Sequence, residues 1–357
     1  MSGKLRNPPL RIGQEPYYGE RGDICLCLSG GGFRAAGFHL GVIAWLYREG
    51  LMRHVQEVRS VSGGSIVAAW MHGNRDLLFG APEPSQEAFE REFAGPLRTF
   101  LAQDIRTAPI VRTVGRNALW KSARCRMISQ KIDALLSQRP PAGSAGGGPT
   151  FRLIAFDVQH REPVELLPEP GRLATQVVAS AAFPPLLGPL KLDGRNLVDG
   201  GLASNLGVAG DTLNRWRCVL VSDASRASPT WSRSRFVPMS MRLLPLLRDG
   251  ANRAFRSQIG AANPEKTLVG VAPLHIADWY GSDQGIPWLE APGRLASLRT
   301  DLAGFSPRLI GVLERRGLKV AQTLLRPAFD IWSIRGEQGD LQPTQAGLRK
   351  ALATWGG

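Results

Sequence analysis

A short apolar segment, followed after one serine by three consecutive glycines, constrains the fold of this 357-residue chain more than any other feature. Residues Ile24–Leu28 are typical of a buried strand, and residues 29–32 follow as a glycine loop. From 35 to 49 apolar residues recur at helical spacing until Gly50. Successive glycines let several backbone N–H groups converge, and the following helix adds its positive N-terminal end. The loop is therefore suited to holding a negatively charged oxygen.

The alternation of strands and helices continues along the chain and predicts an α/β fold with a mainly parallel central sheet. Between 73 and 150 strand signals are scarce and Arg and Lys are frequent, which indicates a helical insertion closed by a Pro- and Gly-rich stretch. Residues 229–357 are helix-like, with scattered Pro and Trp. We predict strands at 55–61, 151–157, 196–198 and 218–222, and helices at 65–72 and 175–182.

A Ser-Val-Ser-Gly-Gly sequence at 60–64 lies between a predicted strand and a predicted helix. A nucleophile elbow is written Gly-x-Ser-x-Gly, because small residues flank a strained turn that exposes the serine hydroxyl. Here Ser60 takes the first small position. The other serines, Ser60 and Ser65, lack small residues two places away on both sides. The expected elbow residues are Ser60, the nucleophile Ser62, Gly63 and Gly64.

The triplet Asp199-Gly200-Gly201 follows a short apolar run and forms a turn that can present its carboxylate to another loop. A plain turn that starts with Asp gives the same triplet, so the alternative stays open on these residues alone. A serine hydrolase normally uses His as its base. None of the five histidines follows a late strand at a loop apex, so we expect a Ser–Asp dyad. Burial beside a hydroxyl raises the pKa of such an Asp and makes it a usable base.

Taken in this order, the three motifs resemble the patatin-like phospholipase family, and residues 179–185 resemble the family's segment before its catalytic Asp. The resemblance covers about 22–225, with weaker similarity at 300–302 and 309–324. It implies a three-layer α/β/α fold in which Ser62 attacks the ester carbonyl and Asp199 accepts its proton. It also implies that no metal or organic cofactor takes part. The implied oxyanion residues are Gly30, Gly31, Gly32, Phe33 and Arg34, the last acting by charge or by orienting the loop.

The sequence departs from the family pattern at three positions. Ser29 and Ala35 stand where family members often have Asp and Gly, and Ser60 replaces the first glycine of the elbow. None of these changes removes a catalytic atom, so they bear on fine geometry and substrate choice.

The amino-acid composition indicates which kinds of partner the protein can bind. Lys and Arg total 44 against 30 Asp and Glu, for a net charge of +14, which favours anionic partners. A basic amphipathic stretch at 233–256 is typical of an ordinary packed helix with a solvated basic face, and the alternative is peripheral contact with an anionic membrane. No nucleic-acid recognition motif appears, so no nucleic acid is expected. The oligomeric state does not follow from the sequence.

Domain organisation and location are expectations of the same kind. We expect an N-terminal arm over 1–21, one patatin-like domain over 22–330 that includes the helical insertion at about 73–150, and a tail over 331–357. The sequence shows no signal peptide and no apolar run of membrane-spanning length, so we expect a cytoplasmic protein that is at most peripheral to a membrane.

Two further functions are weighed against the phospholipase A or lysophospholipase-like activity. The first is a catalytically silent module whose glycine loop holds an anionic ligand. The second is a nucleotide-cofactor enzyme, for which the glycine loop fits the dinucleotide pattern only if Ala is allowed at its last position, and for which no ribose-binding acid is found. The retained Ser62 and Asp199 favour the acyl hydrolase.

Overall fold

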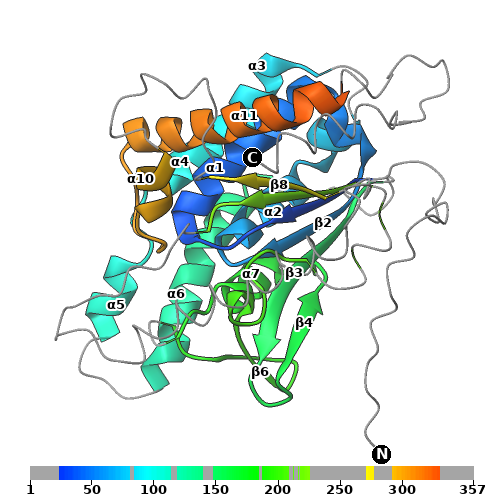
Figure 1. Cartoon of the computed structure of the whole chain (residues 1–357). Coiled ribbons are helices and arrows are strands. Elements are labelled where there is room, and N and C mark those ends of the chain that lie inside the picture. The colour runs from blue at the N-terminus through cyan, green and yellow to red at the C-terminus, as the bar shows by residue number, and fades with distance from the viewer. Residues whose placement is uncertain are drawn as a thin grey trace, which may run out of the picture.

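The computed structural model describes residues 24–80, 84–113, 119–139, 148–184, 187–208, 212, 216, 218–225, 271–276 and 292–329. The described strands form one eight-stranded sheet in the order β5-β6-β3-β2-β1-β7-β8, with β4 paired to β3 (Figure 1). The expected arm at 1–21, the tail at 331–357 and the basic stretch at 233–256 lie outside the described residues. Within the described part of the chain, no helix combines the length and apolar character needed to cross a membrane.

The centre of the sheet is parallel, as the sequence predicts. Strand β1 (Ile24–Leu28) pairs with β2 (Val55–Val61) on one side and with β7 (Cys218–Asp223) on the other. Strand β3 (Thr150–Asp157) continues the parallel ladder beyond β2. Strand β1 is apolar and buried on both faces, as expected of a strand inside a parallel sheet that is covered on both sides. The prediction of an α/β fold with a mainly parallel sheet is therefore confirmed.

The edges of the sheet hold three strands that the sequence analysis did not predict. Strand β4 (Glu162–Leu166) is largely polar, β5 (Leu190–Leu192) has only three residues, and β8 (Val271–His275) lies in a region interpreted as helix-like. Strand β6 (Arg195–Asp199) contains the predicted strand 196–198. Short edge strands carry little hydrophobic periodicity, so their pattern is not distinguishable from that of loops.

Strand β3 brings β2 and β6 together end to end. It pairs with β4 through residues 153–157, which occupies one edge of β3. On the other edge Val61 of β2 pairs with Ile154, and Asp199 of β6 pairs with Ala155. Strand β2 runs parallel to β3 and β6 runs antiparallel, so the two strands approach the same point from opposite directions. The residue after Val61 and the last residue of β6 therefore become neighbours, although 137 positions separate Ser62 and Asp199 in the sequence.

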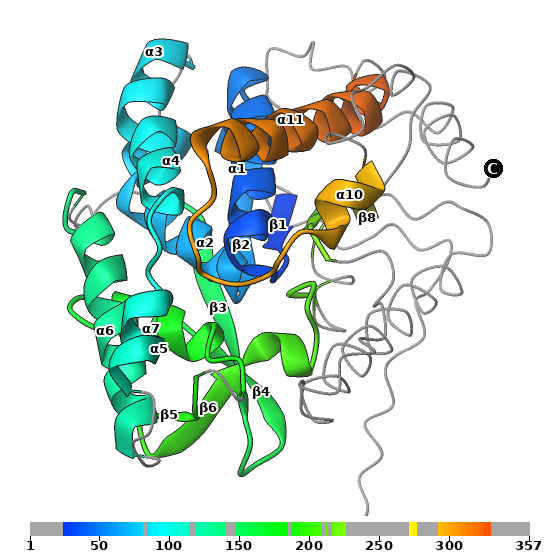
Figure 2. The ribbon, with the colours of Figure 1, turned by 90° about the vertical axis from the view of Figure 1, so that its left-hand side faces the viewer.

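Helices cover one face of the sheet and form the main core with it. Helix α1 (Gly32–Arg48) packs along α11 (Pro307–Phe329), and α2 (Gly63–Gly73) packs beside α1 and α7 (Leu173–Ser180) (Figures 1 and 2). Among the largest fully buried side chains of this core are Phe33, Phe38, Trp45, Trp70 and Phe89. Helix α1 begins three residues earlier than its apolar spacing predicts, because the last glycine of the loop already has the helical hydrogen-bonding pattern.

The described part of the insertion is helical, as its composition predicts, up to the start of β3. A 3-10 turn, η1 (Leu51–His54), precedes β2. The chain enters the insertion at the end of α2, which follows β2. A long hairpin-like arrangement of helices covers one end of the sheet (Figure 2). Its elements are η2 (Asp76–Gly80), α3 (Gln86–Ala88), η3 (Phe89–Ala94), α4 (Gly95–Leu101), α5 (Thr107–Thr113) and α6 (Leu119–Leu136), with η2 and η3 being π-helical. Helix α10 (Pro292–Ser297) precedes α11.

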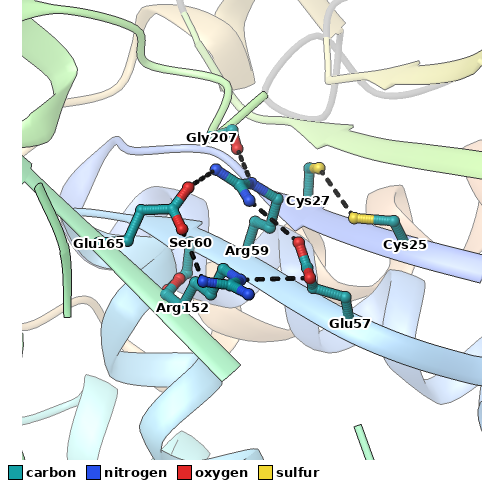
Figure 3. Close-up of polar contacts among 8 residues, drawn as sticks. All are labelled: Cys25, Cys27, Glu57, Arg59, Ser60, Arg152, Glu165 and Gly207. Atoms are coloured by element: carbon teal, nitrogen blue, oxygen red, sulfur yellow. Dashed lines mark hydrogen bonds and ion pairs between the residues drawn. The ribbon is translucent and has the colours of Figure 1, made fainter. Parts of the chain in front are cut away.

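The opposite face of the sheet carries a cluster of buried charges (Figure 3). Glu57 and Arg59 lie on the same face of β2 as Cys25 and Cys27 of β1, their register partners. Arg59 is 4% exposed and donates to Glu57 at 3.0 Å and to Glu165. Arg152 contacts the same two carboxylates at 3.2 and 2.7 Å. Two cations therefore compensate two anions, and the cluster fastens β2, β3 and β4 together.

Candidate active site

The structure has a cavity of about 110 Å³ at the point where β2 and β6 meet. Four of the residues singled out from the sequence line it: Gly31, Gly32, Ser62 and Asp199. The loops that follow parallel strands gather at one edge of the sheet, which is where α/β proteins usually bind ligands. The other lining residues are Arg106, Ile128, Ala181, Phe183, Leu187, Thr300, Asp301 and Leu302.

Ser62 occupies a sharp turn between β2 and α2. Its φ is 53° and its ψ is −120°, a conformation close to the first central position of a type II′ turn, which glycine dominates. The turn directs Ser62 toward the cavity at the N-terminal end of α2. The backbone N–H of Ser62 donates to Oγ of Ser180 at 3.0 Å, and Ser180 in turn donates to the carbonyl of Ile154 at 2.6 Å. The end of α7 therefore holds the strained turn in place.

Asp199 ends β6 and is 3% exposed. One carboxylate oxygen, Oδ1, accepts a hydrogen bond from the N–H of Gly201 at 2.8 Å, and the Asp199 N–H donates to the carbonyl of Ala182 at 3.1 Å. Gly200 lies so close to the Ile154 carbonyl that a Cβ there would collide with it. Both glycines after Asp199 thus serve the turn: Gly201 orients the carboxylate, and Gly200 lets the turn sit against β3.

The glycine loop packs directly against the elbow. A Cβ on Gly63 would lie 2.7 Å from the backbone nitrogen of Gly32, and one on Gly30 would lie 3.1 Å from the Cβ of Ser62. The Gly30 N–H donates to the carbonyl of Asn205 at 2.9 Å. For the N–H groups of Gly31 and Gly32, by contrast, the described residues provide no hydrogen-bond acceptor. Two amides beside Ser62 therefore remain available to a ligand oxygen, at the N-terminal end of α1.

Phe33 and Arg34 support this loop from behind. The Phe33 N–H donates to the carbonyl of Asp301 at 2.9 Å, and its ring packs edge-to-face on Phe100 at 5.6 Å. Arg34 is fully buried and donates to the carbonyls of Ala224, Ala296 and Leu298. Of the two roles expected for Arg34, these contacts favour orienting the loop over direct charge stabilisation.

The other serines of the elbow are engaged in a buried chain of hydroxyls. Oγ of Ser65 lies 2.8 Å from Oγ of Ser180 and 3.1 Å from Oγ of Ser60, and neither Ser60 nor Ser65 lines the cavity. Gly64 approaches the carbonyls of Leu28 and Ser29 too closely to carry a side chain. The elbow is thus tied to β1, to β2 and to α7, with Ser62 as its cavity-facing hydroxyl.

The histidines whose side chains the structure describes lie away from the cavity. His39 is buried below the glycine loop, where Nε2 lies 2.8 Å from the Ser29 carbonyl and Nδ1 lies 2.6 Å from Oγ of Ser222. Because a carbonyl only accepts, Nε2 donates and Nδ1 accepts, and burial lowers the pKa of His39 to about 4. His39 is therefore a neutral residue that positions the loop. His54, His72 and His160 also do not line the cavity.

Several residues of the site were not found from the sequence. Ser180 lies in the segment 179–185 that resembles the family, but no role was assigned to it. Asn205 binds the glycine loop through both its backbone and its side chain, the latter donating to the Gly30 carbonyl at 3.2 Å. Arg106 and Asp301 both line the cavity and form an ion pair with each other. Arg106 is one of many arginines in the insertion, so nothing in the sequence distinguishes it.

The described residues contain no group of three or more His, Cys, Asp or Glu that could hold a metal ion. The expectation that the chemistry needs no metal or organic cofactor stays a prediction. The chemical groups that line the cavity include the Ser62 hydroxyl, the Asp199 carboxylate, two unpaired amides, the Arg106–Asp301 ion pair and apolar walls.

Comparisons with solved structures return distant matches. VipD from Legionella pneumophila matches at 15% identity and a TM-score of 0.37, covering 94% of this chain and 74% of that one. Human GIVD cytosolic phospholipase A2 matches at 12% identity and a TM-score of 0.45, covering 97% and 62%. Its complex with methyl γ-linolenyl fluorophosphonate matches at 15% identity and a TM-score of 0.43, covering 93% and 59%. This chain thus spans 59–62% of the length of the human chains.

No curated protein matches the sequence. The family model described as Patatin-like phospholipase matches residues 26–210, from β1 through the elbow and β6 to the segment that binds the glycine loop. The match covers more than half of the chain, and the chain therefore belongs to the patatin-like phospholipase family.

Proposed function

We propose that this protein is a serine lipid acyl hydrolase of the phospholipase A or lysophospholipase type. Membership of the patatin-like phospholipase family supports a lipid hydrolase in general terms. The observation that carries the finer proposal is the shared cavity: Ser62, Asp199 and the amides of Gly31 and Gly32 line one small space. A nucleophile, a base and an oxyanion site are the three parts that acyl transfer needs.

In the proposed first step Ser62 Oγ attacks the carbonyl carbon of the ester while Asp199 accepts the hydroxyl proton. The carbonyl oxygen becomes an oxyanion, which the amides of Gly31 and Gly32 stabilise, together with the positive ends of α1 and α2. The tetrahedral intermediate expels the alcohol, which takes the proton back from Asp199, and an acyl-Ser62 ester remains.

In the proposed second step Asp199 takes a proton from a water molecule, whose oxygen attacks the acyl-enzyme. The fatty acid leaves and the proton returns to Ser62. The carboxylate is suited to this exchange because Gly201 fixes Oδ1 and thereby the orientation of the whole group.

The walls of the cavity support a lipid as the acyl donor. Ile128, Phe183, Leu187 and Leu302 offer an apolar surface next to the catalytic groups. Burying each methylene of an acyl chain against such a surface contributes about 0.8 kcal/mol. The apolar walls therefore favour esters of fatty acids over esters of small polar acids.

The direct test is hydrolysis of a panel of phospholipids, lysophospholipids and neutral acylglycerols, with products read by mass spectrometry. The wild-type protein is expected to release fatty acid, and Ser62→Ala is expected to release none above background. Thermal denaturation of both proteins shows that the variant is folded. Equal release by Ser62→Ala rejects the proposal, and no turnover together with ligand-dependent stabilisation supports a silent binding module instead.

We also propose peripheral contact with anionic membranes, in a cytoplasmic protein, on the strength of the net charge of +14. Flotation with liposomes tests it. Binding is expected to rise with the fraction of anionic lipid and to fall with salt, whereas binding that is independent of both contradicts the proposal.

A further inference from the structure

We propose that Arg106 binds the phosphate of the substrate, and that this residue makes the enzyme prefer acyl esters with a neighbouring phosphate over neutral acyl esters. The inference rests on the proposed function. It assigns the cavity a second recognition element, beside the catalytic groups, that no resemblance to the family supplied.

The first support is the position of Arg106. It lines the same cavity as Ser62 and Asp199, and that cavity has a volume of only about 110 Å³. An ester whose carbonyl lies at Ser62 therefore places its neighbouring groups within reach of Arg106. In a glycerophospholipid those neighbouring groups include the phosphate.

The second support is that the backbone of Arg106 is fixed. The Arg106 N–H donates to Oδ1 of Asp104 at 3.0 Å, and the same oxygen accepts from the N–H of Thr107 at 2.8 Å. Asp104 thereby caps the start of α5, and its Oδ2 accepts from the Thr107 hydroxyl. The adjacent Ile105 N–H donates to the carbonyl of Leu302 at 3.2 Å. The insertion and the segment before α11 thus hold Arg106 at the mouth of the cavity.

The third support is the incomplete hydrogen bonding of the guanidinium. Nη1 of Arg106 pairs with Oδ2 of Asp301 at 2.5 Å. Nε is buried and has no hydrogen-bond partner among the described residues, although the side chain as a whole is 30% exposed. A buried donor without an acceptor is costly, so a ligand oxygen at this point is favourable. A phosphate offers several oxygens, and the exposed part of the Arg106 guanidinium can bind them beside Asp301.

The fourth support is the sharing of Asp301 between two arginines. Arg106 and Arg299 both lie next to Asp301, the latter with Nε 3.6 Å from Oδ1. The carboxylate of Asp301 also accepts from the N–H of Ala303 at 3.0 Å. Asp301 therefore neutralises Arg106 only in part, and a phosphate can share the guanidinium with it, which a neutral glycerol ester cannot do.

The experiment compares two water-soluble esters with the same short acyl chain, hexanoylglycerol 3-phosphate and hexanoylglycerol. Both are used as monomers, so that binding to a lipid surface plays no part. For Arg106→Gln, kcat/KM with the phosphate ester is expected to fall about 10- to 100-fold more than kcat/KM with hexanoylglycerol, the range for a charge-assisted hydrogen bond. Arg106→Lys is expected to retain part of the preference, since it keeps the charge and loses the planar fork.

Arg126→Gln is the matched control. Arg126 is exposed on α6 and does not line the cavity, so this substitution removes the same unit of charge without changing the cavity wall. Arg126→Gln is expected to leave kcat/KM unchanged for both esters. The rate of labelling by a fluorophosphonate that carries no further charge checks that the catalytic groups of Arg106→Gln remain assembled.

The outcomes separate this inference from the function on which it rests. Equal losses for both esters in Arg106→Gln, or no loss for either, overturn the phosphate contact while the hydrolase remains. If kcat/KM for the phosphate ester falls equally in Arg126→Gln and Arg106→Gln, the effect comes from the overall charge of the protein, and the phosphate contact is overturned as well. A wild-type protein that hydrolyses neither ester and is not labelled overturns the proposed function itself, and this inference with it.

Discussion

Replacing Ser62 by glycine is expected to leave the protein more stable than replacing it by alanine, although both variants lose the hydroxyl. At φ 53° and ψ −120° a residue with a Cβ is strained, and glycine is not. Such strain costs about 1–3 kcal/mol. Glycine gains more freedom in the unfolded chain than alanine, which opposes the effect by about 0.4–1 kcal/mol. The free energy of unfolding of Ser62→Gly should therefore exceed that of Ser62→Ala by about 1 kcal/mol.

Urea unfolding followed by tryptophan fluorescence measures this difference, since the chain has nine tryptophans. The pair Ser65→Gly and Ser65→Ala is the matched control, because Ser65 lies within α2 in the same hydroxyl chain. There the order should reverse, with glycine less stable by about 1 kcal/mol as is usual inside a helix. If glycine is also the less stable replacement at position 62, the turn is not strained and the elbow geometry is wrong.

Three more predictions concern the base, the buried charge cluster and pH. Asp199→Asn keeps the oxygen that accepts from Gly201 but cannot accept a proton, so kcat for ester hydrolysis should fall by about 10²–10⁴ with an unchanged unfolding midpoint; a kcat near wild type contradicts the assignment. Arg59→Met leaves the buried Glu57 with Arg152 as its remaining cation and should lower the free energy of unfolding by up to about 3–5 kcal/mol, whereas Arg91→Met in an exposed pair should cost less than about 1 kcal/mol; equal costs refute the buried network. Because the folded pKa of His39 is about 4 against 6.5 for the free side chain, the unfolded state binds a proton first as pH falls, and about 3 kcal/mol of stability should disappear between pH 6.5 and 4. Urea unfolding at several pH values should show a correspondingly shallower dependence in His39→Gln, and an identical slope speaks against a neutral buried His39.

The parallel centre of the sheet could be predicted from the sequence because its strands are short and mainly apolar, and because β1 and β2 are each followed by a glycine-rich turn. Strand β1 and strand β2 have the predicted bounds, and β3 and β7 differ by one residue at an end. A strand buried on both faces leaves the same apolar signal whatever its neighbours are. Strands β4 and β5 lack that signal because they lie at the edge, where polar side chains reach solvent.

The meeting of Ser62 and Asp199 in one cavity could be anticipated only from the resemblance to a family. Nothing local in the sequence says that β6 runs antiparallel to β3 and ends beside β2. Helix spacing and turn chemistry describe each motif alone, while the strand register joins them. The same limit applies to Arg106 and Asp301, whose pairing depends on how the insertion and the segment before α11 fold over the cavity.

The buried pair Glu57 and Arg59 shows a second limit. Two charges in a seven-residue strand lower its apolar content, and the strand is still central because Arg152, Glu165 and the Gly207 carbonyl complete their hydrogen bonds (Figure 3). Sequence alone shows the charges but not their partners on three other segments.

Covalent trapping with a fluorophosphonate tests the central claim most directly, because the reagent reacts only where a hydroxyl is activated beside an oxyanion site. Intact mass should show one adduct per chain in the wild type, peptide mapping should place it on Ser62, and Asp199→Asn should react much more slowly. Ser62→Ala should gain no adduct. An adduct on Ser60 or Ser65, or one that persists in Ser62→Ala, contradicts the account.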